Sequence, residues 1–215
     1  MHIGKSAGNF ARAAAIGAAV LLLSGCQPKM SVQERAAMLR ALTDTHFRDT
    51  VTVEDDKLDL IARFTTERGM PGEKNSSGYY FQDEYLRGFI DKRTGKRQFQ
   101  LYFTVSYPGP ERVFNAATYD GPNGTEQAVV TIINRSKSCE RSQGVTYCDY
   151  QEDLGLELSE SLVRSIADRY GVGDPIQQFW HYKVYARSGH DFTNVILPAE
   201  AKGLLERMDA HRLVK

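Results

Sequence analysis

The stretch that decides the fold is residues 129–158, VVTIINRSKSCERSQGVTYCDYQEDLGLEL. Apolar and polar residues alternate at both of its ends, which is the pattern of two half-buried β-strands. The polar segment between Cys139 and Cys148, with a glycine at its centre, predicts the turn of a hairpin. A loop of two or four residues centred between Gln143 and Gly144 places opposite each other residues whose numbers sum to 287. Cys139 then faces Cys148 directly.

This register also predicts the buried face of the hairpin. With a two-residue loop the cysteines form a non-hydrogen-bonded pair, whose Cα atoms lie about 4.5 Å apart, within reach of a disulfide. Arg135 falls opposite Glu152 on the same face, either as a charged pair in a pocket or as an ordinary cross-strand ion pair, and we favour the ordinary pair. The apolar residues that share this face, which we therefore expect to point to the core, are Val129, Thr131, Ile133, Leu154, Leu156 and Leu158.

The other strands are predicted by the same alternation. Leu58, Leu60, Ala62 and Phe64 alternate with polar residues and predict a strand with these four side chains on its buried face. Turns rich in Gly, Pro and Asp separate the next segments, so neighbouring strands are expected to pair as antiparallel hairpins. These strands are expected at residues 58–65, 84–90, 97–107, 113–119 and 177–187. A further strand, at residues 126–134, runs into the central stretch.

Three helices complete the predicted fold. Ser31 and Glu34 form a capping box that starts a helix over residues 31–43, and Ser159 caps a second helix that ends near Gly171. Pro198 suits the first turn of a third helix, which runs to about residue 211. The fold class is therefore α+β, an antiparallel β-meander of about seven or eight strands packed with an N-terminal, a middle and a C-terminal helix. A single sheet covered by helices and a two-sheet sandwich both remain open.

The first 26 residues have the layout of a secretory signal. Lys5 and Arg12 precede an apolar run over residues 13–23, and small residues lead to Cys26. A membrane-spanning helix needs about 20 apolar residues, so this run is too short to be one.

The sequence Leu23-Ser24-Gly25-Cys26 resembles the lipobox of bacterial lipoproteins. The resemblance covers residues 1–26 only. It implies that residues 1–25 are removed and that Cys26 carries acyl chains that anchor the protein in a membrane. Residues 26–30 then form a short tether, and residues 31–215 form a single periplasmic domain. Gln27 follows the cysteine and, by analogy with the aspartate that retains lipoproteins at the inner membrane, favours the outer membrane. A cleaved signal with a free Cys26 is the alternative.

Charge and cysteine content agree with this interpretation. The full chain has 27 basic and 27 acidic residues. Removing residues 1–25 takes away two basic residues and no acidic one, so 25 basic and 27 acidic residues remain. A nearly neutral protein lacks the positive excess of nucleic-acid-binding proteins, so no nucleic-acid partner is expected. If Cys26 carries lipid, Cys139 and Cys148 remain to pair in the oxidising periplasm, although two reduced buried thiols are the alternative.

Chemical motifs are scarce in the chain. No metal-ligand spacing, nucleophile motif or nucleotide-binding fingerprint occurs, so neither a metal nor a cofactor is predicted. The strand at residues 177–187 offers a possible binding face for a glycan, lipid or protein, although a solvated strand face is the more ordinary interpretation. The residues of this face are Phe179, His181, Lys183, Tyr185 and Arg187.

Three hypotheses for function follow from these observations. The first is a non-enzymatic, lipid-anchored binding or assembly factor of the cell envelope. The second is a periplasmic hydrolase that uses His190, Asp191 and Glu152. The third is a carrier whose sheet curls around a small apolar ligand. A cleft in which the candidate catalytic side chains converge would indicate the hydrolase. An exposed apolar or aromatic patch would indicate the binding factor, and an apolar cavity in the core would indicate the carrier.

Overall fold

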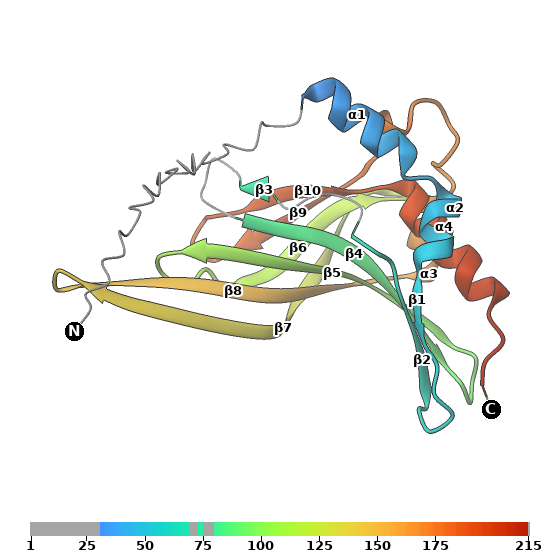
Figure 1. Ribbon diagram of the computed structural model, residues 1–215, viewed down its shortest axis with the longest axis horizontal. Coiled ribbons are helices and arrows are strands. Elements are labelled where there is room, and N and C mark those ends of the chain that lie inside the picture. The colour runs from blue at the N-terminus through green and yellow to red at the C-terminus, as the bar shows by residue number, and fades with distance from the viewer. Residues whose placement is uncertain (1–30, 69–72, 75–79, 215) are drawn as a thin grey trace, which may run out of the picture. The chain divides into compact units, whose positions relative to one another are not determined.

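The computed structural model describes residues 31–68, 73–74 and 80–214 (Figure 1). The predicted signal, Cys26 and the tether lie outside the described residues. The elements, in chain order, are α1 (Val32–Ala41), α2 (Asp44–Thr50), β1 (Thr52–Glu54), β2 (Ile61–Thr65), β3 (Glu73–Lys74), β4 (Tyr80–Asp91), β5 (Arg97–Pro108), β6 (Phe114–Gly121), β7 (Gly124–Ser142), β8 (Val145–Leu158), α3 (Glu160–Ala167), the 3-10 helix η1 (Pro175–Gln177), β9 (Trp180–Ala186), β10 (Phe192–Ile196) and α4 (Pro198–Ala210).

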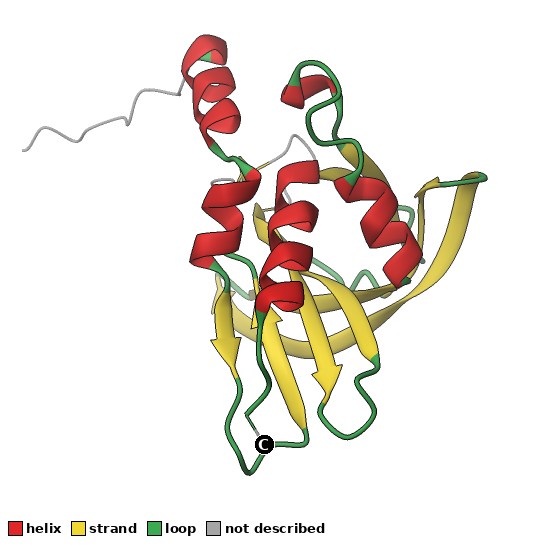
Figure 2. Cartoon of the chain, turned by 90° about the vertical axis from the view of Figure 1, so that its right-hand side faces the viewer, coloured by secondary structure: helices red, strands yellow, loops and turns green. Residues whose placement is uncertain are grey.

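The α+β prediction is confirmed, and the sheet is a single curled one. Its strand order is β1-β2-β4-β5-β8-β7-β6-β9-β10, with β3 paired to β4, and every pair is antiparallel. β7 pairs with β6 through its N-terminal half and with β8 through its C-terminal half, so it carries the sheet from one side of the core to the other. Helix α4 lies between α2 and α3 against the curl (Figures 1 and 2).

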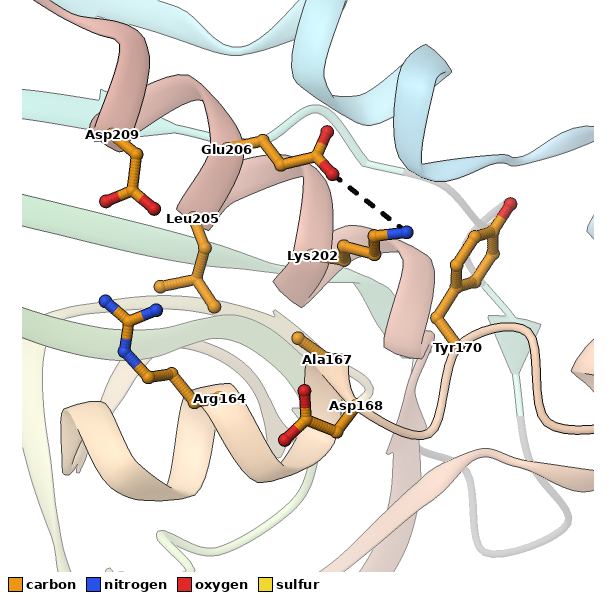
Figure 3. Close-up of a pocket in the computed structure, with 8 residues that line it drawn as sticks. All are labelled: Arg164, Ala167, Asp168, Tyr170, Lys202, Leu205, Glu206 and Asp209. Carbon is orange, nitrogen blue, oxygen red and sulfur yellow. Dashed lines mark ion pairs between the residues drawn. The ribbon is translucent and has the colours of Figure 1, made fainter.

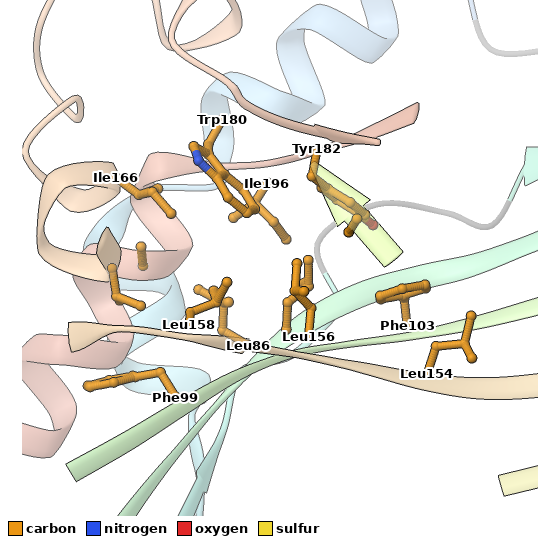
Figure 4. Packing of buried hydrophobic residues seen from close by; sticks show 14 of the residues in the cluster. Leu86, Phe99, Phe103, Leu154, Leu156, Leu158, Ile166, Trp180, Tyr182 and Ile196 are labelled. Atoms are coloured by element: carbon orange, nitrogen blue, oxygen red, sulfur yellow. The ribbon is translucent and has the colours of Figure 1, made fainter. Parts of the chain in front are cut away.

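The core lies between the two halves of the curled sheet. Side chains of β5 and β8, such as Phe103 and Leu156, face Trp180 and Tyr182 of β9 across it (Figure 4). The helices close the core at one end, where Ile166 of α3 joins the same cluster. The curl therefore buries one face of nearly every long strand without a second sheet.

The register of the central hairpin is partly as predicted. Cys139 pairs with Cys148 and Arg135 with Glu152, but the register shifts by one residue between Ile132 and Asn134. We predicted that Val129, Thr131 and Ile133 point to the core together with the leucines of β8. This prediction is wrong for the three β7 residues. A bulge adds one residue to β7 and reverses its alternation. Val130 is buried with 5% of its surface exposed, whereas Val129 is 75% exposed.

The predicted disulfide between Cys139 and Cys148 is confirmed, with a Cα–Cα distance of 4.1 Å. The turn beyond it consists of Gln143 and Gly144, which have positive φ angles of 50° and 82°. Two consecutive residues of this kind are what a two-residue type I′ hairpin turn requires. The two-residue alternative is therefore the one that the chain adopts.

The helix predictions are confirmed at their starts and are less accurate at their ends. Ser31 and Glu34 form the capping box of α1, Ser159 caps α3, and Pro198 lies in the first turn of α4. The first helix ends at Ala41, and the unpredicted α2 follows it. α2 packs against α4 at Gly203, where an added Cβ would lie 2.7 Å from the Asp44 carbonyl oxygen, so the glycine permits this close contact.

The strand predicted from Leu58 begins later than expected. β2 starts at Ile61, and Leu58 and Leu60 are 83% and 80% exposed. The Asp56 side chain accepts a hydrogen bond from the Leu58 backbone N–H at 2.8 Å, and the Asp56 carbonyl accepts one from the Asp59 N–H at 3.0 Å. This local turn ends the extended run before the alternation does. Ala62 and Phe64 are fully buried, as predicted.

A buried carboxylate fastens the C-terminal segment to the β1–β2 connection. The Asp55 side chain, 3% exposed, forms an ion pair with Lys92 and lies 2.7 Å from Nε2 of His211. It also accepts the Val214 backbone N–H at 2.8 Å. The hydrogen bond from Lys92 is the main cause that lowers the pKa of Asp55 well below its usual value, with His211 and Val214 adding to it.

We expect the substitution Asp55→Asn to destabilise the protein near neutral pH and to matter less in acid. A lowered pKa stabilises the folded state fully above the unfolded-state pKa of about 3.9, and this stabilisation is lost progressively as the pH falls from that value through the lower folded-state pKa. Urea midpoints of the wild type and the variant should therefore differ by a constant amount from about pH 6 to pH 4.5 and draw closer as the pH falls to about 3. The exposed Asp59→Asn serves as the control. A gap between wild type and Asp55→Asn that stays constant down to about pH 3 would contradict the assignment.

Candidate functional site

The predicted binding face lies on the outer side of strand β9. Trp180, Tyr182, Val184 and Ala186 point into the core, as their burial shows. The alternate residues of β9 therefore face outward, and Arg187 follows them on the surface. Phe179 is separated from this face because it precedes β9 and packs with the second apolar cluster, whose buried members are Leu39, Phe47, Leu197 and Ala199.

Neighbouring strands complete the face with polar groups. Lys183 pairs with Thr118 of β6 on one side and with Thr193 of β10 on the other. These residues form a row across three strands, with His181 and Tyr185 on either side of Lys183 along β9. A shallow groove of about 220 Å³ opens here, and its lining residues are Thr118, Tyr119, Asp120, Thr125, His181, Tyr182, Lys183 and Thr193.

Contacts within the face hold its polar groups in place. The Lys183 ammonium lies 3.2 Å from Asp191 and 4.6 Å from the centre of the Tyr185 ring. The Tyr185 hydroxyl and the Thr118 hydroxyl are 3.1 Å apart, and Asp191 also accepts the Ala186 backbone N–H at 3.1 Å. The face therefore presents an ammonium, two hydroxyls and an imidazole from rigid strands, a set that can hydrogen-bond a polar or hydroxylated ligand.

The residues proposed for a hydrolase are held in different contacts. Glu152 of β8 is fully buried, and it accepts hydrogen bonds from the Tyr107 hydroxyl and from Arg135 at 3.2 Å. Asp191 is engaged at the β9–β10 turn by Lys183 and the Ala186 backbone, and His190 beside it is exposed.

The Glu152 cluster instead joins the β5–β6 connection to the central hairpin. The Tyr107 hydroxyl accepts the Arg112 backbone N–H at 3.2 Å, and Arg135 also pairs with Glu111. Burial, followed by the hydrogen bond to Glu152, raises the pKa of Tyr107 well above its usual value. The predicted Arg135–Glu152 pair is thus present at 3.2 Å, as part of a larger network that runs from the buried Glu152 and Tyr107 to the partly exposed Arg135 and Glu111.

A second groove, of about 420 Å³, lies between helices α3 and α4 (Figure 3). Leu205 and Ala167 form apolar parts of its wall, and charged side chains surround them. Lys202 pairs with Asp44 at 2.7 Å and Arg164 pairs with Glu160 at 2.6 Å, just as Lys183 of the β9 face pairs with Asp191, so the cations do not distinguish the two sites. The face on β9 is the stronger candidate because it adds the neutral donors and acceptors of Thr118, Thr193 and His181, whereas the polar groups of this groove, Tyr170 apart, are charged.

Two searches of the described residues gave negative results. No group of three or more His, Cys, Asp or Glu side chains in residues 31–68, 73–74 and 80–214 is placed to hold a metal ion. Within the same ranges, no helix combines the length and the apolar character needed to cross a membrane.

Comparisons of the chain with protein-family models, with curated proteins and with solved structures found no match.

Proposed function

We propose that the chain is a lipid-anchored protein of the bacterial envelope, held at the periplasmic side of the outer membrane, and that it binds a partner without catalysing a reaction. The binding surface of this proposal is the outer face of β6, β9 and β10. The observation that carries it is the row of Thr118, Lys183 and Thr193, which spans three strands and opens into a groove.

The compartment rests on two observations. Residues 23–26 resemble a lipobox at the end of an apolar run. Cys139 and Cys148 form a disulfide on a hairpin, and disulfides persist in oxidising compartments such as the periplasm. The hydrolase and the ligand carrier stay alternative predictions.

Among the partners considered, a glycan fits the chemistry of the face best. Sugar hydroxyls both donate and accept hydrogen bonds, and they match hydroxyl groups such as those of Thr118 and Thr193. Tyr185 adds an aromatic ring beside Lys183, against which an apolar sugar face can pack.

The anchor is tested by the intact mass of the protein purified from a membrane fraction. We expect a mature chain that begins at Cys26, carries acyl mass, and gains one hydrogen on each of Cys139 and Cys148 when reduced. A water-soluble species without lipid would contradict the anchor and leave the binding face to be judged separately.

Binding is tested by co-sedimentation of the full chain, in detergent, with insoluble cell-wall glycan purified from bacteria. The variant His181→Ala/Lys183→Ala is expected to lower the affinity about tenfold or more, since each lost polar contact is worth on the order of 1 kcal/mol. Lys96→Ala removes an exposed lysine far from the face in sequence and is the matched control. Equal sedimentation of both variants with the glycan would contradict the assignment of this face.

A further inference from the structure

Two hairpins carry most of the large apolar side chains that are exposed in the described part of the chain. One is the β1–β2 hairpin and the other is the long β7–β8 hairpin. Large contiguous patches of exposed apolar side chains are rare on monomeric proteins, and they often mark interaction sites. The exposed apolar residues on these two hairpins are Leu58, Leu60, Ile61, Val129, Ile132, Ile133, Val145 and Tyr147.

The β1–β2 hairpin borders a groove of about 480 Å³, called here the β1–β2 groove. Its lining is partly apolar, and two of the apolar residues, Leu58 and Leu60, are more than three-quarters exposed. Arg63 in the groove is already paired with Glu54 at 2.9 Å. The full lining is Glu54, Leu58, Asp59, Leu60, Ile61, Arg63 and Phe89.

The end of the β7–β8 hairpin, residues 139–148, is called here the arm. In this part β7 and β8 pair only with each other, because β5 stops pairing at Asp149. Val145 and Tyr147 are 50% and 64% exposed, and two residues apart on a strand they share one face, about 6.6 Å from each other. The disulfide cross-links the arm at its base, so this apolar pair is held on a stiff ribbon.

The charges on the two surfaces are complementary. Lys57 and Asp59 flank the exposed leucine Leu58. On the arm, Glu140 lies opposite Tyr147 and shares its face, whereas Arg141 lies opposite Thr146 on the other face. Among the described residues, neither Lys57 nor Glu140 has an ion-pair partner within 4.0 Å. The exposed leucines are thus accompanied by an unpaired cation, and the apolar face of the arm by an unpaired anion.

The two surfaces cannot meet within one chain. The arm and the β1–β2 hairpin lie at different ends of the domain (Figure 1). A second copy can bring them together, because each copy carries both surfaces.

We propose that the arm of one copy docks into the β1–β2 groove of a second copy. Val145 and Tyr147 cover Leu58 and Leu60, and Glu140, which shares their face, pairs with Lys57. The contact joins different surfaces of the two copies, so it is head-to-tail and can continue along a row of molecules. It is small, and we expect a dissociation constant on the order of 10 to 100 µM. The β9 face takes no part, so this contact is independent of the proposed function.

The test uses the full chain purified in detergent and analytical ultracentrifugation across a concentration series. The wild type is expected to exceed the mass of one chain as its concentration rises. The groove variant Leu58→Ser/Leu60→Ser and the arm variant Val145→Ser/Tyr147→Ser should each stay at the mass of one chain. All four side chains are exposed, so both variants are expected to fold as the wild type does, which circular dichroism checks.

Mixing the two variants distinguishes this contact from other kinds of association. Each variant keeps one intact surface, so an equimolar mixture should give a dimer of twice the single-chain mass and nothing larger. Val172→Ser, which alters an exposed valine outside both hairpins, should associate like the wild type. A wild type that stays at single-chain mass throughout, or variants that associate as it does, would overturn the proposal.

A charge exchange gives a second test of the same contact. Glu140→Lys and Lys57→Glu should each weaken the association about tenfold, because each leaves like charges facing each other. An equimolar mixture of the two restores opposite charges at every contact of an alternating row, so it should associate as the wild type does, and so should one chain carrying both substitutions. Loss of association in the mixture and in the double variant would contradict the assigned pairing of Glu140 with Lys57.

Discussion

Replacing Trp180 by alanine is expected to lower the free energy of unfolding by about 3 to 5 kcal/mol. Trp180 is fully buried and lies at the start of β9, in the half of the sheet that faces β5 and β8. Its ring centre is 5.8 Å from that of Tyr182 and 5.5 Å from that of Tyr119. Its Nε1 also donates a hydrogen bond to the Asp120 carbonyl at 2.8 Å, so truncation removes both packing and this hydrogen bond.

This effect is measured by urea unfolding followed by circular dichroism. Fluorescence is unsuitable for the comparison because Trp180 is the single tryptophan of the chain. Tyr147→Ala removes an exposed aromatic ring and should change the free energy of unfolding by no more than about 0.5 kcal/mol. If Trp180→Ala costs no more than this control, the two halves of the sheet are not held together through Trp180.

The second large effect is expected for Glu152→Ala, at about 3 to 5 kcal/mol. Glu152 is fully buried, and its two oxygens accept from the Tyr107 hydroxyl and from Arg135. Removing it leaves a buried hydroxyl without its acceptor and a partly buried guanidinium with Glu111 alone. Both consequences destabilise the junction between the β5–β6 connection and the central hairpin.

Two companion variants make this prediction specific. Glu152→Gln keeps an acceptor for Tyr107 and should fall between the wild type and the alanine variant. Glu140→Ala removes an exposed carboxylate from the same hairpin and should be nearly neutral. Chemical denaturation of the three variants gives the comparison, and equal losses for Glu140→Ala and Glu152→Ala would contradict a stabilising buried network.

The features that short segments of sequence specify were predicted correctly. The capping box at Ser31, the proline that opens α4, and the turn centred between Gln143 and Gly144 each depend on neighbouring residues only, although the sequence left a two-residue and a four-residue loop open for that turn. The pairing of Cys139 with Cys148 followed from their spacing about that turn. Local backbone chemistry is readable in this way because it involves few competing interactions.

The features that depend on distant parts of the fold were not predictable. The bulge near Ile133 lies where β7 leaves its pairing with β6 and passes to β8, and that change of partner cannot be seen in the alternation of β7. Leu58 and Leu60 share the alternation of the buried Ala62 and Phe64, but they lie in a turn before β2 and are exposed. β1 and β3 are too short to show a period, and in β10 only the first and last residues are buried, so it does not alternate. In the described part of the chain the sheet therefore has ten strands, where about seven or eight were expected.

The candidate site was predicted on one strand only. His181, Lys183, Tyr185 and Arg187 share a face, as the period of two indicated. Thr118 joins them because β6 pairs with β9, and that pairing is not local in the sequence. Phe179 continues the alternation but precedes the strand, so it turns to a different apolar cluster.

The disulfide on the arm also bears on the order in which the chain folds. Cys139 and Cys148 are 9 residues apart, so their encounter closes a short loop that needs no other part of the domain. By contrast, β6 must find β9, and β5 must find β8, across longer segments, and such contacts form slowly. An early cross-link fixes the register of β7 and β8 while the remaining strands are still unpaired. In a chain that crosses a membrane from its N-terminus, the central hairpin can therefore serve as a template before β9, β10 and α4 have emerged.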